Sequence, residues 1–141
     1  MNEAVHPRDI VLIVDDSPET LGFLTDALEQ SGFSVLIATS GNAAINVVDR
    51  ITPDVILMDA VMPGMNGFET CRTLKTNPSV AQVPVIFMTG LTETEHIVHA
   101  LESGGVDYLS KPINIDELRA RIRVHLANAR SAQSARVALD A

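Results

Sequence analysis

The stretch Ile10-Val11-Leu12-Ile13-Val14-Asp15-Asp16 consists of five apolar residues followed at once by two carboxylates. A short, continuous apolar run that is rich in β-branched residues is typical of a strand buried on both faces of a sheet. Four further runs of the same character follow, at residues 33–38, 55–58, 83–88 and 106–109. The sequence therefore predicts five buried, parallel strands.

Segments with helical spacing follow each of these runs, at residues 20–30, 40–50, 66–76, 92–103 and 114–129. Ser17-Pro18 predicts the start of the first helix, and Gly104-Gly105 predicts the end of the fourth. Strands that alternate with helices predict an α/β fold of the flavodoxin-like, doubly wound kind. We expect a five-stranded parallel sheet in the order 2-1-3-4-5 with helices on both faces. Ligands of such sheets bind beyond the carboxyl ends of the strands, where the order switches between the first and third strands.

Length and composition indicate one ordinary globular domain of 141 residues, of which 46% are hydrophobic. No apolar run approaches the roughly 20 residues that span a bilayer. Residues 1–9 lack the apolar core of a signal peptide. The single cysteine, Cys71, cannot form an intrachain disulfide. We expect a cytoplasmic protein that does not enter a membrane.

The net charge of −8 disfavours binding to nucleic acid, which depends on Lys and Arg. Five arginines lie in the last quarter of the chain, where they indicate a solvated helix face: Arg119, Arg121, Arg123, Arg130 and Arg136. Any binding to DNA is therefore expected to come from an output domain outside this sequence.

Three carboxylates mark the ends of the first and third strands. Asp15 and Asp16 follow the first strand, and Asp59 follows the third. Carboxylates in close contact repel one another, and a hard cation such as Mg²⁺ relieves that repulsion. The backbone carbonyl of Val61 is a further candidate ligand. In the alternative interpretation, Asp15 and Asp16 only cap a helix and Asp59 only begins a turn, but Ser17-Pro18 and Pro63-Gly64 already supply those signals.

The ends of the fourth and fifth strands add a hydroxyl and an ammonium group. Thr89 comes at the end of the fourth strand, and Lys111 follows the fifth. Each is weak evidence alone. Together with the three acids they predict one cluster built from four strand ends.

With these residues in place, the sequence resembles the receiver domain of two-component response regulators, chemotaxis regulators among them, from about residue 10 to residue 126. The motifs that carry the resemblance are VLIVDD at 11–16, LMD at 57–59, MPGMNG at 62–67, MTG at 88–90 and DYLSKP at 107–112. They occur in the family's order, each at or just after a strand end.

The resemblance implies a role for each matching residue. Asp59 corresponds to the phosphoacceptor, and Asp15 and Asp16 to the pair that binds Mg²⁺. Lys111 corresponds to the lysine that pairs with the phosphoryl oxygens, and its bond to Pro112 to a cis peptide. The switch residues are Thr89 and the aromatic Tyr108. The phosphoryl donor is expected to be a phosphohistidine on a histidine kinase or phosphotransfer protein.

The family mechanism also implies how modification becomes a signal. The Thr89 hydroxyl follows the phosphoryl group, Tyr108 enters the space that Thr89 leaves, and the surface of the fourth helix, fifth strand and fifth helix is repacked. Such a surface often serves for phosphorylation-dependent homodimerisation. The expected output of the longer protein is regulation of transcription through a DNA-binding domain, with a signalling enzyme or a sensor kinase as alternatives.

Two positions depart from the pattern of fast-cycling receivers. Val61 and Leu91 stand two residues after Asp59 and Thr89, where polar residues often orient the hydrolytic water. The sequence therefore predicts slow autodephosphorylation. Gly90 stands where alanine is more usual, without consequence for function.

Two other functions remain as alternatives. A degenerate receiver would act only as a phosphorylation-independent binding module, but it would not need all five of the site residues. A phosphatase with an aspartyl nucleophile would carry a second acid where Val61 stands. The chain is therefore expected to be a switch and not an enzyme with a separate substrate.

The remaining features give weaker expectations. His96 and His99 have a spacing that suits a metal but is more often a solvated helix surface, and His125 has no neighbouring ligand in sequence. We expect an N-terminal tail at 1–8, a receiver domain at 9–127, and at 128–141 either an extension of the last helix or a linker to a missing output domain.

Overall fold

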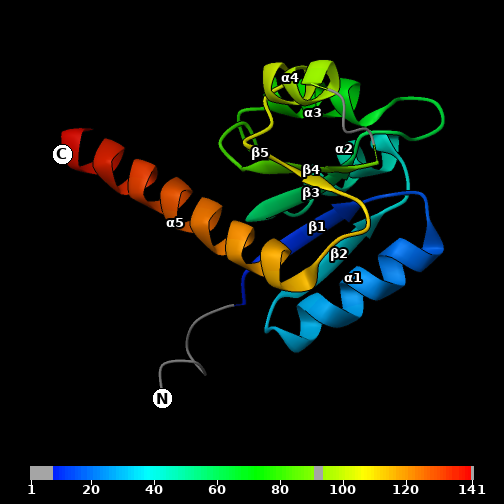
Figure 1. The fold of residues 1–141 in the computed structure, drawn as a ribbon. Helices are drawn as coiled ribbons and strands as arrows, with labels where there is room; N and C mark the ends of the chain where they lie inside the picture. Colours follow the sequence, from blue (N-terminus) through cyan, green and yellow to red (C-terminus); the bar gives the residue numbers. More distant parts are fainter. Residues whose placement is uncertain (1–7, 91–93, 141) are drawn as a thin grey trace.

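The computed structural model describes residues 8–90 and 94–140, and side chains within those ranges except at residue 94 and residues 133–140. In these ranges five strands alternate with five helices (Figure 1). They are β1 (Ile10–Val14), α1 (Pro18–Gln30), β2 (Ser34–Ala38), α2 (Gly41–Val48), β3 (Val55–Asp59), α3 (Gly67–Lys75), β4 (Val85–Thr89), α4 (Thr94–Glu102), β5 (Asp107–Ser110) and α5 (Ile115–Asp140). All neighbouring strands are parallel, in the order β2-β1-β3-β4-β5. The predicted α/β fold and strand order are confirmed.

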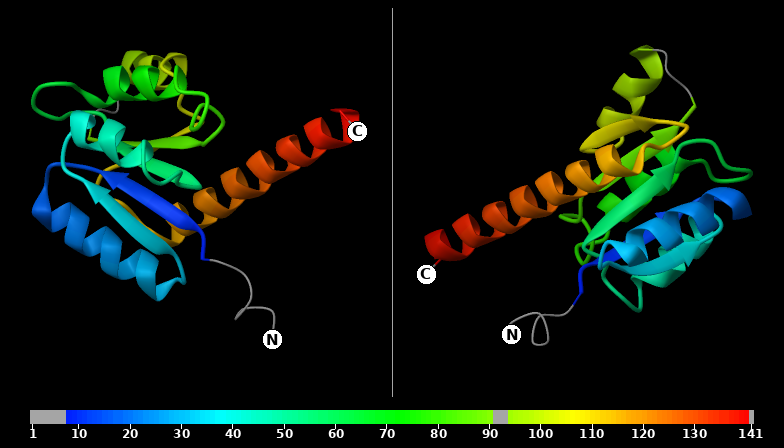
Figure 2. Two further views of the ribbon diagram at one scale, coloured as in Figure 1. Left: turned by 180° about the vertical axis from the view of Figure 1, so that it is seen from behind. Right: turned by 60° about the horizontal axis from the view of Figure 1, so that its bottom comes forward.

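The sheet is buried on both faces, as its continuous apolar strands predict. Leu12 and Val14 of β1 point into one core, which α2, α3 and α4 cover. Val11 and Ile13 point into the other core, which α1 and α5 cover. Figure 2 shows these two helical layers on either side of the sheet. Side chains alternate between the faces because successive residues of a strand point in opposite directions.

Capping side chains fix the first residues of helices α1, α2 and α3. The Ser17 and Ser40 hydroxyls accept hydrogen bonds from the backbone N–H groups of Thr20 (3.3 Å) and Ala43 (3.1 Å). Asn66 and Glu69 form a reciprocal capping box at the start of α3. The predicted helix starts at 40 and 66 are thus cap residues, and each helix begins one residue later.

The bounds of β1 match the expected ones, and those of the other four strands differ by one or two residues at one or both ends. β4 begins at Val85 and not at Val83, because Pro84 has no N–H to donate, although its carbonyl accepts from Ile56 N at 3.0 Å. Asp59 and Thr89 are the last residues of β3 and β4.

Helix α5 is much longer than the core that it covers. Leu118, Ile122 and Leu126 are buried against the sheet, on one face of the helix because they are three or four residues apart. The helix continues past residue 129 to Asp140, which is the helical alternative of the two expected for 128–141, and it extends beyond the body of the domain (Figure 1). The expected start of the fourth helix at residue 92 lies outside the described residues.

Candidate functional site

The three predicted carboxylates meet at the carboxyl edge of the sheet. Asp15, Asp16 and Asp59 each offer an oxygen, and these oxygens all lie within 4.8 Å of one another. Asp15 and Asp59 are buried, whereas Asp16 is exposed. Among the residues that the structure describes, this is the one group of three or more acidic, histidine or cysteine side chains that could hold a metal ion.

Backbone N–H groups fix the orientation of the two buried carboxylates. Ser17 N donates to Asp15 Oδ1 at 2.8 Å, and Val61 N donates to Asp59 Oδ1 at 3.2 Å. Each bond joins a carboxylate to the backbone two residues later, which is the turn that Asp side chains favour. One oxygen of each carboxylate is thereby held, and the other can face the centre of the cluster.

Lys111 supplies the positive charge of the cluster. Its Nζ lies 3.1 Å from Asp15 Oδ2 and 3.3 Å from Asp59 Oδ2. Its backbone N–H donates to the Thr89 carbonyl at 2.9 Å, which places it beside the end of β4. The Lys111-Pro112 bond is cis, as the resemblance implies. One ammonium group therefore bridges two carboxylates from different strands.

Burial and charge act in opposition on these groups. Burial raises the pKa of Asp59 above its ordinary value, and the Lys111 ammonium and the Val61 N–H offset only part of that effect. Burial alone would lower the pKa of Lys111, but the hydrogen bond to Asp15 and the charges of Asp59 and Asp15 hold it above its ordinary value. Lys111 therefore stays a cation, which a charge-neutralising role requires.

The other predicted residues surround this cluster. Thr89 is buried at the end of β4 and pairs in register with Ser110. Tyr108 is half-buried and packs against the core cluster under α3 and α4. The Val61 side chain is 58% exposed beside Asp59. Leu91 lies outside the described residues.

Gly67 also shapes the site, although it is not among the predicted site residues. A Cβ added to it would lie 2.1 Å from the Asp59 carbonyl oxygen, so only glycine permits this approach of α3 to β3. Gly67 N also donates to Ala60 O at 3.0 Å. In the sequence, the glycine that ends the MPGMNG motif was the signal that could have identified this position.

The histidines of α4 do not join a metal cluster in the described structure. The His99 ring stacks on Phe68 with centroids 4.1 Å apart, and its Nε2 lies 3.3 Å from Arg72 Nη1. His99 is therefore only partly exposed on the helix surface, because its ring packs against α3.

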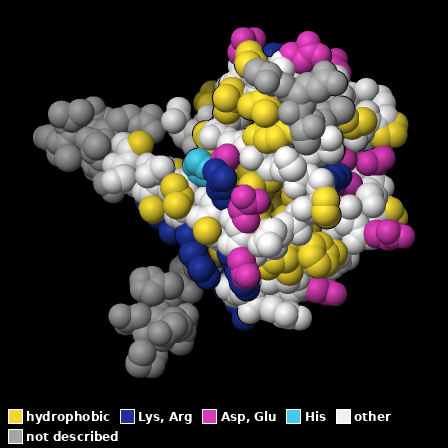
Figure 3. Space-filling view, in the orientation of Figure 1, with side chains coloured by type: hydrophobic (Ala, Val, Ile, Leu, Met, Phe, Trp, Pro, Cys, Tyr) yellow, Lys and Arg dark blue, Asp and Glu magenta, His cyan; other side chains and the backbone are white. Residues whose placement is uncertain are grey.

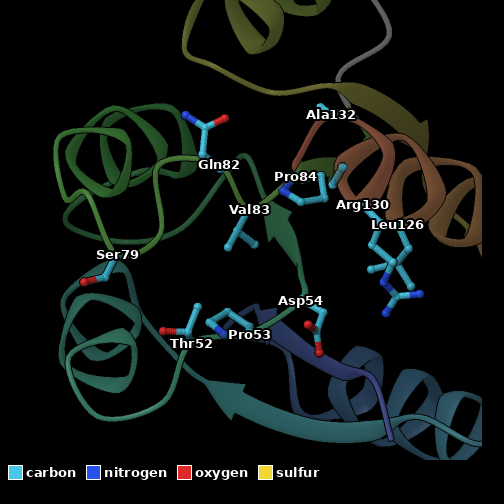
Figure 4. A pocket seen from close by; sticks show the side chains of 11 residues that line it. Thr52, Pro53, Asp54, Ser79, Gln82, Val83, Pro84, Leu126, Arg130 and Ala132 are labelled. Carbon is cyan, nitrogen blue, oxygen red and sulfur yellow. The ribbon is translucent and has the colours of Figure 1, made fainter. Parts of the chain in front are cut away.

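A hollow of about 320 Å³ lies at the opposite, amino edge of the sheet. Figure 4 shows its lining, which includes Pro53 before β3, Val83 and Pro84 before β4, and Leu126 of α5. None of the predicted site residues lines it. The chemistry of this fold is expected at the other edge.

A family model described as the response regulator receiver domain matches residues 11–123. The chain belongs to this family. Over 119 residues, this receiver domain is 39% identical to the DNA-binding response regulator MtrA of Mycolicibacterium smegmatis, a match that covers 84% of this chain and 51% of that protein. Over 121 residues it is 40% identical to a probable cyclic di-GMP phosphodiesterase of Vibrio cholerae, covering 86% and 27%. The chain spans about half or less of the length of these two relatives.

Solved receiver structures have the same fold. The chemotaxis protein CheY4 of Vibrio cholerae superposes with a TM-score of 0.80 at 27% identity, covering 83% of this chain and 98% of that one. The receiver domain of a histidine kinase from Syntrophus aciditrophicus superposes with a TM-score of 0.79 at 32% identity, covering 85% and 91%. No helix in the described ranges has the length and apolarity that a membrane span needs.

Proposed function

We propose that this receiver domain accepts a phosphoryl group on Asp59 with Mg²⁺ bound at Asp15, Asp16 and Asp59, and switches its α4–β5–α5 surface in response. The observation that carries the proposal is the bridge from Lys111 to Asp15 and Asp59, at 3.1 and 3.3 Å, beside the exposed Asp16. A solitary buried aspartate could be structural. An acceptor beside both an acidic cluster and a fixed cation has the parts that phosphoryl transfer requires.

The donor set fits Mg²⁺, which prefers oxygen ligands and is held by few carboxylates. Asp15, Asp16 and Asp59 would hold the ion, with the Val61 carbonyl as a further ligand. When bound, Mg²⁺ supplies positive charge that the phosphoryl oxygens need.

The proposed reaction transfers a phosphoryl group from a histidine to a carboxylate. An Asp59 oxygen forms the new P–O bond as the P–N bond of the phosphohistidine breaks, and the imidazole leaves with the electron pair. Asp59 needs no proton transfer, because it attacks as the anion. Lys111 stays within reach to neutralise the transferred oxygens.

The switch is proposed to run from Thr89 to Tyr108. Thr89 ends β4 at the acceptor edge, and Tyr108 pairs in register with Phe87, two residues before Thr89 on the same strand. The surface that these residues underlie carries four large hydrophobic side chains exposed to solvent: Val98, Leu101, Val106 and Val124. Such exposed side chains suit a partner surface, including a second copy of the chain.

Partners and output are part of the proposal. A histidine kinase or phosphotransfer protein would supply the phosphoryl group in the cytoplasm. The relatives named as a DNA-binding regulator and as a probable phosphodiesterase suggest that a receiver of this kind controls an attached output. We favour transcription, through a DNA-binding part outside this sequence.

The test uses the 141-residue chain with acetyl phosphate, with and without Mg²⁺. Intact mass should show the gain of one phosphoryl group that depends on Mg²⁺ and is lost in Asp59→Asn. The matched control is Asp26→Asn, an exposed aspartate on α1 that should still accept the group.

The same sample reports the switch. Tyr108 is the single tyrosine and the chain has no tryptophan, so intrinsic fluorescence reads the surroundings of Tyr108 directly. The fluorescence should change with phosphorylation. No mass gain would favour a binding module, and rapid turnover of acetyl phosphate without a stable adduct would favour a phosphatase.

A further inference from the structure

Asp107, the first residue of β5, is tied to helix α5 by two of that helix's side chains. His125 Nε2 lies 2.8 Å from Asp107 Oδ2, and Arg121 Nη1 lies 3.1 and 3.2 Å from the two carboxylate oxygens. Arg121 and His125 are one helical turn apart and so share a face of α5. Spacing along the sequence gives His125 no partner, because Asp107 is 18 residues away.

The Asp107–His125 bond is largely shielded from water, whereas the Arg121 side chain is 45% exposed. The Asp107 and His125 side chains are 14% and 16% exposed. Burial raises the pKa of Asp107, but the hydrogen bonds from His125 and the Tyr108 N–H, with the Arg121 charge, hold it below its ordinary value. The carboxylate is therefore ionised and only accepts, so His125 Nε2 donates a charge-assisted hydrogen bond. Figure 3 shows a histidine beside basic and acidic side chains where α5 crosses the body.

The same carboxylate also accepts a hydrogen bond from the backbone of the proposed switch residue. Tyr108 N donates to Asp107 Oδ1 at 2.8 Å. Neighbouring strand residues point to opposite faces of the sheet, and Tyr108 packs with the core under α3 and α4, whereas Leu109, two residues after Asp107, packs with the core under α1 and α5. Asp107 and Tyr108 therefore connect the two sides of the sheet.

We infer that Asp107, Arg121 and His125 couple the position of Tyr108 to helix α5, and that α5 carries the change away from the domain as a rigid rod. The inference rests on the proposed function, because Tyr108 is expected to move only when Asp59 is modified. At about 1.5 Å per residue, the 26 residues of α5 span about 39 Å. A small rotation at Arg121 and His125 becomes a larger displacement near Asp140.

The experiment measures a distance between two spin labels on the full chain, at Asn46→Cys on α2 and Ser131→Cys on α5, both exposed positions. Cys71 is fully buried, and the chain without added cysteines controls for its labelling. The distance distribution is recorded with Mg²⁺ alone and with Mg²⁺ and acetyl phosphate. Intact mass confirms modification in every sample.

The coupling predicts a shift of the distance on phosphorylation that Asp107→Asn and His125→Ala reduce by at least half. His125→Gln should restore it, since the glutamine amide can also donate to Asp107. Arg123→Ala, an exposed neighbour on α5, should leave it unchanged.

Three outcomes would overturn the coupling. They are an unchanged distance in the phosphorylated parent, an equal shift in Asp107→Asn, and failure of His125→Gln to differ from His125→Ala. Circular dichroism of each variant separates loss of coupling from loss of fold. A parent chain that gains no phosphoryl group would instead refute the proposed function, and the coupling with it.

Discussion

Replacing Lys111 by an uncharged residue should show how much its positive charge contributes to phosphorylation. Lys111→Met keeps an unbranched side chain but leaves Asp15 and Asp59 without the ammonium that lies 3.1 and 3.3 Å from them. Because lost electrostatic stabilisation of a transferred group costs on the order of a hundredfold in rate, phosphorylation by acetyl phosphate should slow by about that factor. The measurement is the rate of mass gain at fixed Mg²⁺. Lys111→Arg is the control that keeps the charge, and an undiminished rate in Lys111→Met would contradict the assigned role.

The Tyr108 hydroxyl should be dispensable for packing. It is buried and has no hydrogen-bond partner in the described structure. An unpaired buried hydroxyl costs free energy, so Tyr108→Phe should raise the free energy of unfolding by about 1 kcal/mol. Urea unfolding followed by circular dichroism measures this, with Tyr108→Ala as a control that should instead destabilise. A loss of stability in Tyr108→Phe would show that the hydroxyl has a partner.

Val61 should lengthen the life of the phosphorylated state. Its apolar side chain stands beside Asp59, where it cannot orient a water molecule for hydrolysis. The parent phosphoprotein in Mg²⁺ should therefore decay over times much longer than seconds, and Val61→Asn should shorten its half-life. Val61→Ile, which stays apolar, is the matched control. Decay within seconds that Val61→Asn leaves unchanged would refute the explanation.

For single residues, the sequence predicted which side chains lie at strand ends, but it did not predict contacts between residues far apart in the sequence. Asp15, Asp16 and Asp59 could be placed together because parallel strands end at a common edge. The bond of His125 to Asp107 and the stack of His99 on Phe68 depend on how helices sit against their neighbours, which spacing does not reveal. The motif at 62–67 was the sequence signal for Gly67, but its close approach to the Asp59 carbonyl oxygen is a contact that spacing does not reveal.

At the scale of elements, the position of helix α3 against β3 depends on having glycine as the first residue of the helix. Gly67→Ala would bring a Cβ within 2.1 Å of the Asp59 carbonyl oxygen and 2.9 Å of Ala60 Cα, both on the backbone. The helix must then move from β3, so Gly67→Ala should destabilise the fold by at least about 2 kcal/mol and slow phosphorylation.

Gly22 of α1 is the matched comparison for that variant. It lies in a helix interior with nothing within 4 Å of a built Cβ. Gly22→Ala should therefore stabilise the chain by about 0.5–1 kcal/mol, because alanine is the better helix former. Urea unfolding of both variants tests the pair. Similar effects of the two substitutions would show that the close approach at Gly67 is not the cause.

Element types were easier to predict than element bounds. Continuous apolar runs identified every described strand, and most errors were single residues at caps. The bounds moved where local hydrogen bonding decides them, as at Ser40, Asn66 and Pro84. Helix α5 could not be bounded because the sequence after Leu126 has neither a strong apolar stripe nor a stop signal.

At the scale of the whole molecule, the acidic cluster opposes the burial that stabilises the sheet. The cluster lies at the ends of β1 and β3, and residues of these two strands pack in both hydrophobic cores. Without a cation beyond Lys111, repulsion among three carboxylates works against closing that edge. A bound Mg²⁺ would therefore act on global stability as well as on phosphorylation.

Binding of Mg²⁺ should consequently raise the melting temperature of the full chain. A ligand that binds only the folded state stabilises it by about 2.7 kcal/mol at a hundredfold excess over its dissociation constant. Asp16→Asn removes an exposed carboxylate from the cluster, so this variant should be at least as stable as the parent in chelator and should gain less from Mg²⁺. Thermal unfolding in EDTA measures the stability without the ion, and a Mg²⁺ series at constant ionic strength measures the gain from Mg²⁺. Asp26→Asn, remote on α1, should respond as the parent does, and an equal Mg²⁺ response in Asp16→Asn would place the ion elsewhere.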